Sequence, residues 1–259
     1  MTESLLTKLD NGVMTLTLNR PTVFNSFNQE MGRAFQAALD EAASNDAVRC
    51  VVITGEGRAF CAGQDLNEVM ADSSPGFKVI VEETYNRSIR RICGMEKPVV
   101  AAVNGVAAGA GANIALACDF VVAKSSAKFV QAFANIGLIP DSGGTFWLPR
   151  LVGMARAKAL TMLGTPLLAT EAEAMGMIHQ AVDDEAFEGQ VQALATKLAS
   201  MPTRGLGLTK KALHLGMTND LHAQLALELD LQFEAAETAD YAEGVQAFLA
   251  KRKPTFQGR

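Results

Sequence analysis

Three short apolar runs in the first half of the chain restrict its fold more than any other feature. They are residues 50–54, 99–103 and 120–123, and the turn residues Gly55 and Asn104-Gly105 follow the first two. Continuous apolar runs of this length are typical of strands that are buried on both faces of a parallel sheet. We therefore expect an α/β fold in which each of these strands is followed by a turn and a helix.

The residues before the first run predict a hairpin and a helix. Apolar residues alternate with threonines late in residues 4–19, after a turn sequence at residues 10–12, which favours two antiparallel strands. From residue 28 onward, Met31, Phe35 and Leu39 recur four residues apart. This spacing places them on one face of a helix.

The second half of the chain is predicted to be helical. Thr170 and Glu173 fit the spacing of a capping box, and Gly176 stands where that short helix should end. Helical periodicity continues over residues 186–200, 203–215 and 220–250. We expect an α/β core in residues 1–195 and a helical region in residues 196–259.

Composition favours a soluble folded protein with no affinity for polyanions. The 259 residues suffice for one large domain, or for a core with a small appendage. Apolar residues make up 49% and charged residues 20%, and the net charge is −5. That charge gives no reason to expect nucleic acid or an anionic membrane as a partner. Since no window approaches roughly 18 uncharged apolar residues, we also expect no membrane span.

The four cysteines, at positions 50, 61, 93 and 118, form no CxxC pair. A disulfide framework or a zinc site is therefore disfavoured, and a reducing cytosol is favoured. The first residues also lack the basic start and the apolar stretch of a signal peptide. We expect a cytoplasmic protein that holds no metal.

Residues 60–68 form the first candidate site. Asp65 and Glu68 are spaced for reciprocal capping of a helix, and we favour that role over direct catalysis by Asp65. Gly63 is free to adopt a positive φ, and the N–H of Gln64 could then point into a cleft. There it would bind an oxyanion.

Residues 104–113 form the second candidate site, because small residues after a strand let backbone N–H groups approach a ligand. Gly109 and Gly111 suggest a dinucleotide-binding turn, but Ile114 replaces the third glycine of that fingerprint. The segment also lies about 100 residues into the chain, away from the first strand-to-helix turn where that fingerprint belongs. Tight helix packing explains the small residues equally well.

The third candidate site is Asp141-Ser142, which precedes two glycines as the nucleophile of trypsin-like proteases does. Such a serine needs a histidine base. The chain has three histidines, all in its last third: His179, His214 and His222. We therefore expect Ser142 to be a residue of a helix start and not a nucleophile. Asp141 is either a cap for that helix, which composition favours, or a general base whose pKa is raised by apolar neighbours such as Ile139 and Phe146.

Several motifs occur in an order that resembles a known family. They are Leu18-Asn19-Arg20-Pro21, Gly57 to Leu66, Lys97-Pro98-Val99 through Asn104-Gly105-Val106-Ala107, Cys118-Asp119, and Gly137 to Asp141 with Gly143-Gly144-Thr145. This ordered set is similar to the enoyl-CoA hydratase/isomerase (crotonase) family over nearly the whole chain. The resemblance implies a crotonase-like spiral of ββα turns and a C-terminal helical region that forms trimers, often paired into hexamers. It also implies an acyl-CoA substrate, with coenzyme A as part of the substrate and no other cofactor.

The resemblance assigns roles to residues of the first two sites. The backbone N–H groups of Gln64 and Ala110 match the pair that holds the thioester oxygen of the substrate in that family. Ala62, Asp65 and Leu66 complete the set that is expected to bind the acyl-CoA. Residues 1–195 would then be the catalytic core and residues 196–259 the oligomerisation region.

The third site indicates which reaction of the family to expect. Hydratases of the family activate water with two glutamates, and Asn113 and Phe133 stand at those positions here. Neither side chain can take a proton from water, so hydration is disfavoured. Asp141 matches a carboxylate that several isomerases of the family carry, which makes it the expected catalytic base for a proton shift.

Four stretches resemble one subgroup of the family most closely: residues 61–67, residues 137–145 with 147–150, residues 177–184 and residues 243–249. That subgroup isomerises ring-1,2-epoxyphenylacetyl-CoA to oxepin-CoA in phenylacetate degradation and also shifts double bonds from position 3 to position 2. We expect this activity. The alternatives are an enoyl-CoA hydratase, a fatty-acid Δ3,Δ2-enoyl-CoA isomerase, a non-catalytic acyl-CoA-binding partner of a hydratase, and a dinucleotide oxidoreductase.

Overall fold

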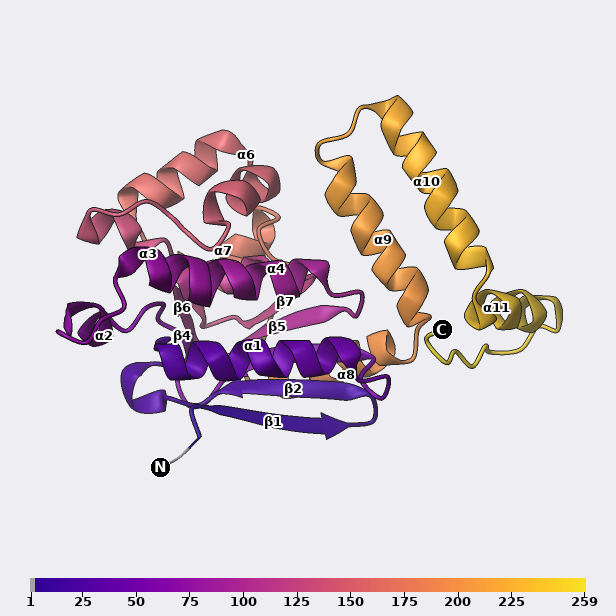
Figure 1. The fold of residues 1–259 in the computed structure, drawn as a ribbon, viewed down its shortest axis with the longest axis horizontal. Coiled ribbons are helices and arrows are strands. Elements are labelled where there is room, and N and C mark those ends of the chain that lie inside the picture. The colour runs from indigo at the N-terminus through magenta and orange to yellow at the C-terminus, as the bar shows by residue number, and fades with distance from the viewer. Residues whose placement is uncertain (1–2) are drawn as a thin grey trace.

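The computed structural model describes residues 3–259 (Figure 1). Within this range ten strands form two sheets. The strands are β1 (Leu5–Asp10), β2 (Val13–Leu18), β3 (Cys50–Gly55), β4 (Ala59–Cys61), β5 (Val99–Val103), β6 (Val106–Ala108), β7 (Phe120–Lys124), β8 (Lys128–Val130), β9 (Leu167–Leu168) and β10 (Gln180–Val182). Residues 1 and 2, with which the predicted core begins, lie outside the described residues.

Helices connect the strands and continue beyond them. The α-helices are α1 (Gln29–Ser44), α2 (Leu66–Met70), α3 (Phe77–Val79), α4 (Arg87–Gly94), α5 (Ala110–Leu116), α6 (Gly144–Leu163), α7 (Ala169–Ala174), α8 (Phe187–Ala199), α9 (Thr203–Gly216), α10 (Leu221–Ala236) and α11 (Ala239–Leu249). The 3₁₀-helices are η1 (Pro21–Val23) and η3 (Ala132–Ile136), and the π-helix is η2 (Ile80–Asn86). Since α3, η2 and α4 follow one another directly, residues 77–94 form one continuous helical segment.

The larger sheet has six strands in the order β1-β2-β3-β5-β7-β10. The strands β1 and β2 are antiparallel, and all the other pairs are parallel. Every residue of β5 is buried, as expected for a strand covered on both faces. The predicted hairpin and the three predicted buried strands are therefore confirmed.

The second sheet corrects the prediction from the apolar runs that a helix directly follows each turn, and it agrees with the ββα turns that the family resemblance implies. Each of β3, β5 and β7 is followed by a turn and another short strand, and only then by a helix. These short strands, β4, β6 and β8, pair in parallel, and β9 completes the sheet in antiparallel orientation. Strands of three residues are too short to show an alternating pattern, which is why the residue pattern alone did not reveal them.

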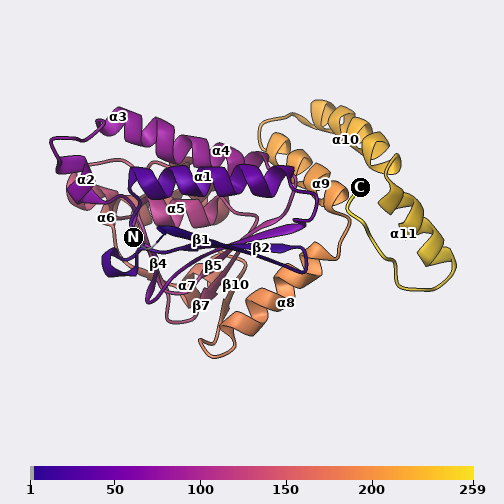
Figure 2. The same cartoon turned by 60° about the horizontal axis from the view of Figure 1, so that its bottom comes forward.

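Helices cover both faces of the larger sheet. Figure 2 shows α1, α4 and α5 on one face and α8 on the other. Val51 and Ile53 of β3 pack in the first apolar cluster, whereas Cys50 and Val52 pack in the second, against α8. This alternation follows from the two-residue period of a strand.

The predicted boundary between residues 195 and 196 lies inside α8. Ala195 is fully buried in the cluster between α8 and the sheet, and the helix ends at Ala199. Pro202 precedes α9, where the chain leaves the sheet. The structural core therefore extends to about Ser200, because the apolar face of α8 belongs to it.

The start of α7 also differs from the prediction. Leu168 is its N-cap residue, and its backbone N–H donates to the Glu171 carboxylate at 3.1 Å. Glu171 thus caps the residue three positions before it, which is the spacing of a capping box. The pair of Leu168 and Glu171 lies two positions earlier than the predicted pair of Thr170 and Glu173. Gly176 has a φ of +77° just beyond the helix, so the predicted stop is correct.

The helices α9, α10 and α11 extend away from the two sheets as an arm (Figure 1). Where helical periodicity predicted one long segment over residues 220–250, the structure has two helices, because Thr238 caps the start of α11 by accepting from the Tyr241 N–H. No helix in residues 3–259 combines the length and the apolar character needed to cross a membrane.

Candidate active site

One cavity of about 440 Å³ brings the three candidate sites together. Its lining includes Gln64 from the first site, Ala110 from the second and Asp141 from the third. The predicted substrate-binding residues Ala62 and Leu66 also line it. Gln64 and Ala110, which are far apart in the sequence, meet here because they follow the neighbouring parallel strands β4 and β6, and parallel strands end at the same edge of a sheet.

The backbone around Gln64 has the predicted conformation. Gly63 has a φ of +93°, which a residue with a side chain rarely adopts. The bridge between residues 27 and 64 uses the Gly63 carbonyl and the Asp65 N–H. Within the described part of the chain the Gln64 N–H has no acceptor, so it remains available to a ligand.

The Ala110 N–H lies close to this turn. Ala110 is the first residue of α5, so its N–H has no partner within the helix. A Cβ atom placed on Gly63 would lie 3.4 Å from Ala110 N and 3.0 Å from the Ala108 carbonyl oxygen. The two backbone donors therefore belong to segments in close contact at one end of the cavity.

Asp65 has a structural role in this geometry. Its Oδ1 atom accepts from the Asn67 N–H at 3.1 Å and caps α2, as predicted. Its Oδ2 atom pairs with the Arg20 guanidinium at 2.9 Å. Glu68 does not complete the predicted reciprocal cap, because the Asp65 N–H donates to Phe27 and Glu68 accepts from the Gln29 N–H instead. Asp65 does not line the cavity.

The side chain of Gln64 is held at both ends of its amide, which the sequence did not reveal. Its Oε1 atom accepts from the Tyr85 hydroxyl at 2.8 Å, and its Nε2 atom donates to Glu68 at 3.0 Å. Burial raises the pKa of Tyr85 well above its usual value, so the hydroxyl stays a donor. This clamp fixes the residue whose backbone N–H faces the cavity.

Asp141 lines the same cavity. The N-cap residue of α6 is Gly143, and no side chain caps this helix, so of the two alternatives for Asp141 the capping role is excluded. Its carboxylate accepts from the Ser142 hydroxyl at 2.8 Å. Burial raises the pKa of Asp141, and the Ser142 hydrogen bond partly opposes that shift. A carboxylate with a raised pKa is suited to general-base catalysis.

The two apolar residues predicted beside Asp141, Ile139 and Phe146, do not line the cavity. Ile139 is 80% exposed, whereas Phe133 and Leu138 line the cavity with Asp141. Most of the remaining wall comes from residues 66–85: Leu66, Val69, Phe77, Ile80, Val81 and Tyr85. Three of these belong to η2, and π-helical turns are frequent at functional sites.

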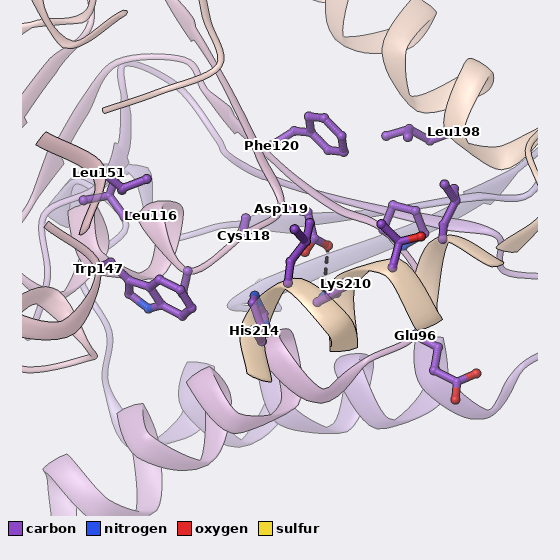
Figure 3. A pocket seen from close by; sticks show the side chains of 15 residues that line it. Glu96, Leu116, Cys118, Asp119, Phe120, Trp147, Leu151, Leu198, Lys210 and His214 are labelled. Carbon is purple, nitrogen blue, oxygen red and sulfur yellow. Dashed lines mark hydrogen bonds and ion pairs between the residues drawn. The ribbon is translucent and has the colours of Figure 1, made fainter. Parts of the chain in front are cut away.

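None of the three histidines lines this cavity. His214 lies beside Trp147, with ring centroids 5.4 Å apart, in a second cavity of about 290 Å³ between α9 and the core (Figure 3). His179 packs on Phe120. Ser142 therefore has no histidine base at the first cavity, which removes the protease-like interpretation.

The second cavity contains an ion pair that ties α9 to the core. Lys210 donates to Asp119 at 2.9 Å and to the Ile92 carbonyl at 2.7 Å (Figure 3). Lys210 is buried, and both of its partners belong to the core. The pair therefore anchors the base of the arm.

The cysteines are free thiols. Cys61 adjoins the oxyanion turn, but burial raises its pKa to about 12, so it is no nucleophile. Across residues 3–259 no group of three or more His, Cys, Asp or Glu side chains is placed to hold a metal ion.

The chain is similar to known proteins over nearly its whole length. The model of the family described as "Enoyl-CoA hydratase/isomerase" matches residues 8–259. The 1,2-epoxyphenylacetyl-CoA isomerase of Escherichia coli (strain K12) is 52% identical over 262 residues, which cover 100% of both chains. A protein of Rhodobacter capsulatus named "Probable enoyl-CoA hydratase" is 48% identical over 252 residues, 97% of each chain.

A solved structure shows the same fold. The crystal structure of an enoyl-CoA hydratase from Polaromonas sp. JS666 superposes with a TM-score of 0.92 at 35% sequence identity. The match covers 97% of this chain and 99% of that chain.

Proposed function

The chain belongs to the enoyl-CoA hydratase/isomerase family, and from this premise we propose that it isomerises the ring epoxide of 1,2-epoxyphenylacetyl-CoA to oxepin-CoA. The family and the subgroup predicted from the motifs are confirmed. One observation carries the proposal: Gln64, Ala110 and Asp141 line a single apolar cavity. The 52% identical relative is named for this substrate, and the aromatic residues Phe77, Tyr85 and Phe133 in the wall suit a six-membered ring.

In the proposed mechanism Asp141 acts as the general base. Its carboxylate removes an acidic proton beside the thioester carbonyl, while the N–H groups of Gln64 and Ala110 stabilise the enolate oxygen. With the epoxide, the C–C bond between the two epoxide carbons breaks while both C–O bonds are kept, which gives the seven-membered ring, and protonated Asp141 returns the proton to a ring carbon. With a 3-enoyl-CoA, protonated Asp141 returns the proton further along the chain and leaves a 2-enoyl-CoA. No water is added, and coenzyme A enters only as part of the substrate.

Hydration is the second candidate, since the 48% identical relative carries a hydratase name. It is disfavoured because Asn113 and Phe133 stand where hydratases of the family have glutamates, and neither can accept a proton from water. Within the described residues Asp141 is the one carboxylate that lines the cavity.

We propose three further properties of the protein. The arm, which begins at Thr203, forms a homotrimer that can pair into a hexamer, because its outer face is apolar. A hydratase of the same family is a further candidate partner. The protein acts in the cytoplasm, where its free cysteines remain reduced, as a step of phenylacetate catabolism.

The test compares wild type with Asp141→Asn on the phenylacetyl-CoA epoxide and on a 3-enoyl-CoA. We expect wild type to convert both without an added cofactor and the variant to turn over about 10²–10⁴-fold more slowly, the usual effect of losing a general base. Products formed in ¹⁸O-labelled water should contain no label in the isomerase reaction, whereas hydration would introduce it. Equal rates for the two proteins would remove Asp141 from the mechanism and favour a non-catalytic acyl-CoA-binding role.

The folding of Asp141→Asn gives the control. Burial raises the pKa of Asp141, so the ionised carboxylate is less favourable in the folded than in the unfolded state. The protonated carboxyl group therefore stabilises the folded state fully below the pKa of the unfolded chain. This contribution is lost as the pH rises through the higher pKa of the folded protein. At neutral pH the melting temperature of the asparagine variant should therefore equal or exceed that of wild type.

A further inference from the structure

Two buried amide side chains lie beneath the turn that carries Asp141, outside the cavity lining. Asn113 on α5 donates from Nδ2 to the Asp141 carbonyl oxygen at 2.9 Å. Its Oδ1 atom accepts from Gln131 Nε2 at 2.8 Å. Asn113 is 0% exposed and Gln131 5% exposed, so both amides are built into the interior. Amides so deeply buried are uncommon, because each polar atom needs a partner there.

The turn rests directly on the Asn113 amide. A Cβ atom on Gly144 would lie 2.3 Å from Asn113 Nδ2, so a residue with a side chain could not occupy that position. The Gly144 N–H also donates to the Asp141 carbonyl oxygen, at 2.8 Å. Two donors therefore hold one carbonyl, and that carbonyl belongs to the proposed base.

The pair does not serve stability alone. Gln131 Oε1 is buried and has no partner in the part of the chain that the structure describes. An unpaired buried acceptor opposes folding, and two apolar side chains of similar shape would avoid that penalty. The presence of two buried amides, instead of two apolar side chains, is explained if Asn113 has a role besides stability that an apolar residue could not have.

We infer that Asn113 and Gln131 are positioning residues that set the base against the oxyanion hole. Asn113 lies three residues after Ala110 on α5, so the helix that supplies a backbone donor also holds the Asp141 turn. Gln131 fixes the orientation of the Asn113 amide, because its Nε2 must meet an oxygen and so directs the Asn113 NH₂ group toward Asp141. This inference rests on the proposed function, since it requires Asp141 to act as the base.

The test compares Asn113→Leu, Gln131→Met and the double variant with wild type, by kcat, KM and thermal stability. Asn113→Leu should lower kcat roughly 10–100-fold with KM nearly unchanged, as expected when a reacting group is misplaced by a fraction of an ångström to an ångström. It should also lower stability, because Gln131 Nε2 loses its acceptor. The double variant removes both amides, so it should regain stability while kcat stays low. If the amides had only a structural role, the double variant would regain both its stability and its kcat.

A matched control and a separate failure test complete the design. Thr54→Val removes a 2.9 Å hydrogen bond from a side chain to the Ala102 carbonyl in the larger sheet, away from the cavity, and should leave kcat unchanged. A double variant with kcat within about threefold of wild type would overturn the inference, whatever the single variants do. If the double variant is active but Asp141→Asn is slow in the same assay, the positioning role is excluded while Asp141 remains the proposed base. If Asp141→Asn is as fast as wild type, the proposed function itself fails.

Discussion

The helices α1 and α10 each have 16 residues but opposite surroundings. Three large apolar side chains of α1 are fully buried against the core: Met31, Phe35 and Leu39. Four of α10 are more than half exposed: Leu221, Leu225, Leu229 and Phe233. Leu231 is the one residue of α10 that is buried. The first helix is held by its own chain, whereas the second has an apolar face that no other part of residues 3–259 covers.

This difference separates two tasks along the chain. The residues that line the active cavity lie between Ala62 and Asp141, and the arm begins at Thr203. A defect in the first region should therefore change the chemistry and leave assembly intact, and a defect in the second should do the reverse. Three variants test this separation, and they are given from the largest expected effect to the smallest.

Gly63→Ala should give the largest effect. The φ of +93° and the 3.0 Å approach of a Cβ atom to the Ala108 carbonyl oxygen leave no room for a methyl group. The turn must shift and displace the Gln64 N–H. Loss of one oxyanion donor typically lowers kcat about 10²–10³-fold. Steady-state kinetics measures this loss, and light scattering should show an unchanged molar mass.

The control for this variant is Gly153→Ala. Gly153 also has a positive φ, +78°, but a Cβ atom there would meet no neighbour within 4 Å. It should lose some stability from backbone strain and keep its kcat. If both glycine variants lost activity equally, backbone strain alone would explain the result and the oxyanion turn would have no special role.

Phe233→Glu should disrupt assembly. Phe233 is 67% exposed on α10, and a charge at the centre of an apolar interface is strongly unfavourable. The change should weaken self-association by roughly 30-fold or more, the effect of losing one interface hot spot of about 2 kcal/mol. Analytical ultracentrifugation measures the shift, and turnover per protomer should fall far less than in Gly63→Ala.

Gln232→Glu is the matched substitution, because Gln232 is exposed next to Phe233 on the same helix. It should leave the association unchanged. A wild-type protein that is monomeric at micromolar concentration would contradict the proposed role of the arm.

Ser142→Ala should give the smallest effect. The Ser142 hydroxyl lowers the pKa of Asp141 against the rise caused by burial, so its loss raises that pKa further. A general base must be ionised, and the acidic limb of the kcat/KM profile should therefore move to higher pH. Well above that limb, turnover should stay within about threefold of wild type. An inactive Ser142→Ala beside an active Asp141→Asn would restore the nucleophile interpretation.

The elements with a long, regular pattern were predictable from the sequence. The hairpin, α1 and the strands β3, β5 and β7 follow from periods of two and of three to four residues and from apolar runs. The three-residue strands and the π-helix η2 were not, because each is shorter than the window in which a period can be recognised. The start of α7 was misplaced since the N-cap there, Leu168, is a residue type with no capping side chain.

The backbone donors of the active cavity and the Asp141 carboxyl group were predictable from the sequence, but the side chains that hold them were not. The positive φ of Gly63 and the proximity of Ala110 were expected from glycine and from the family motifs. The side chains that hold those groups, Tyr85 and Gln131, carried no local signal, since their partners lie 21 and 18 residues away in the sequence. The roles of Tyr85 and Gln131 can be recognised only in the folded structure, where Tyr85 lies beside Gln64 and Gln131 lies beside Asn113.

The origin of the cavity wall has a consequence for enzyme engineering. Six wall residues come from one uninterrupted stretch, residues 66–85, whereas both proposed oxyanion donors are peptide groups that no side-chain exchange removes. A large part of the cavity wall and the oxyanion donors thus come from different segments of the chain, although Glu68 and Tyr85 of the block also hold Gln64. Replacing that block, with Glu68 and Tyr85 retained, by the corresponding block of a relative should transfer acyl-group preference and leave the groups that perform the reaction in place.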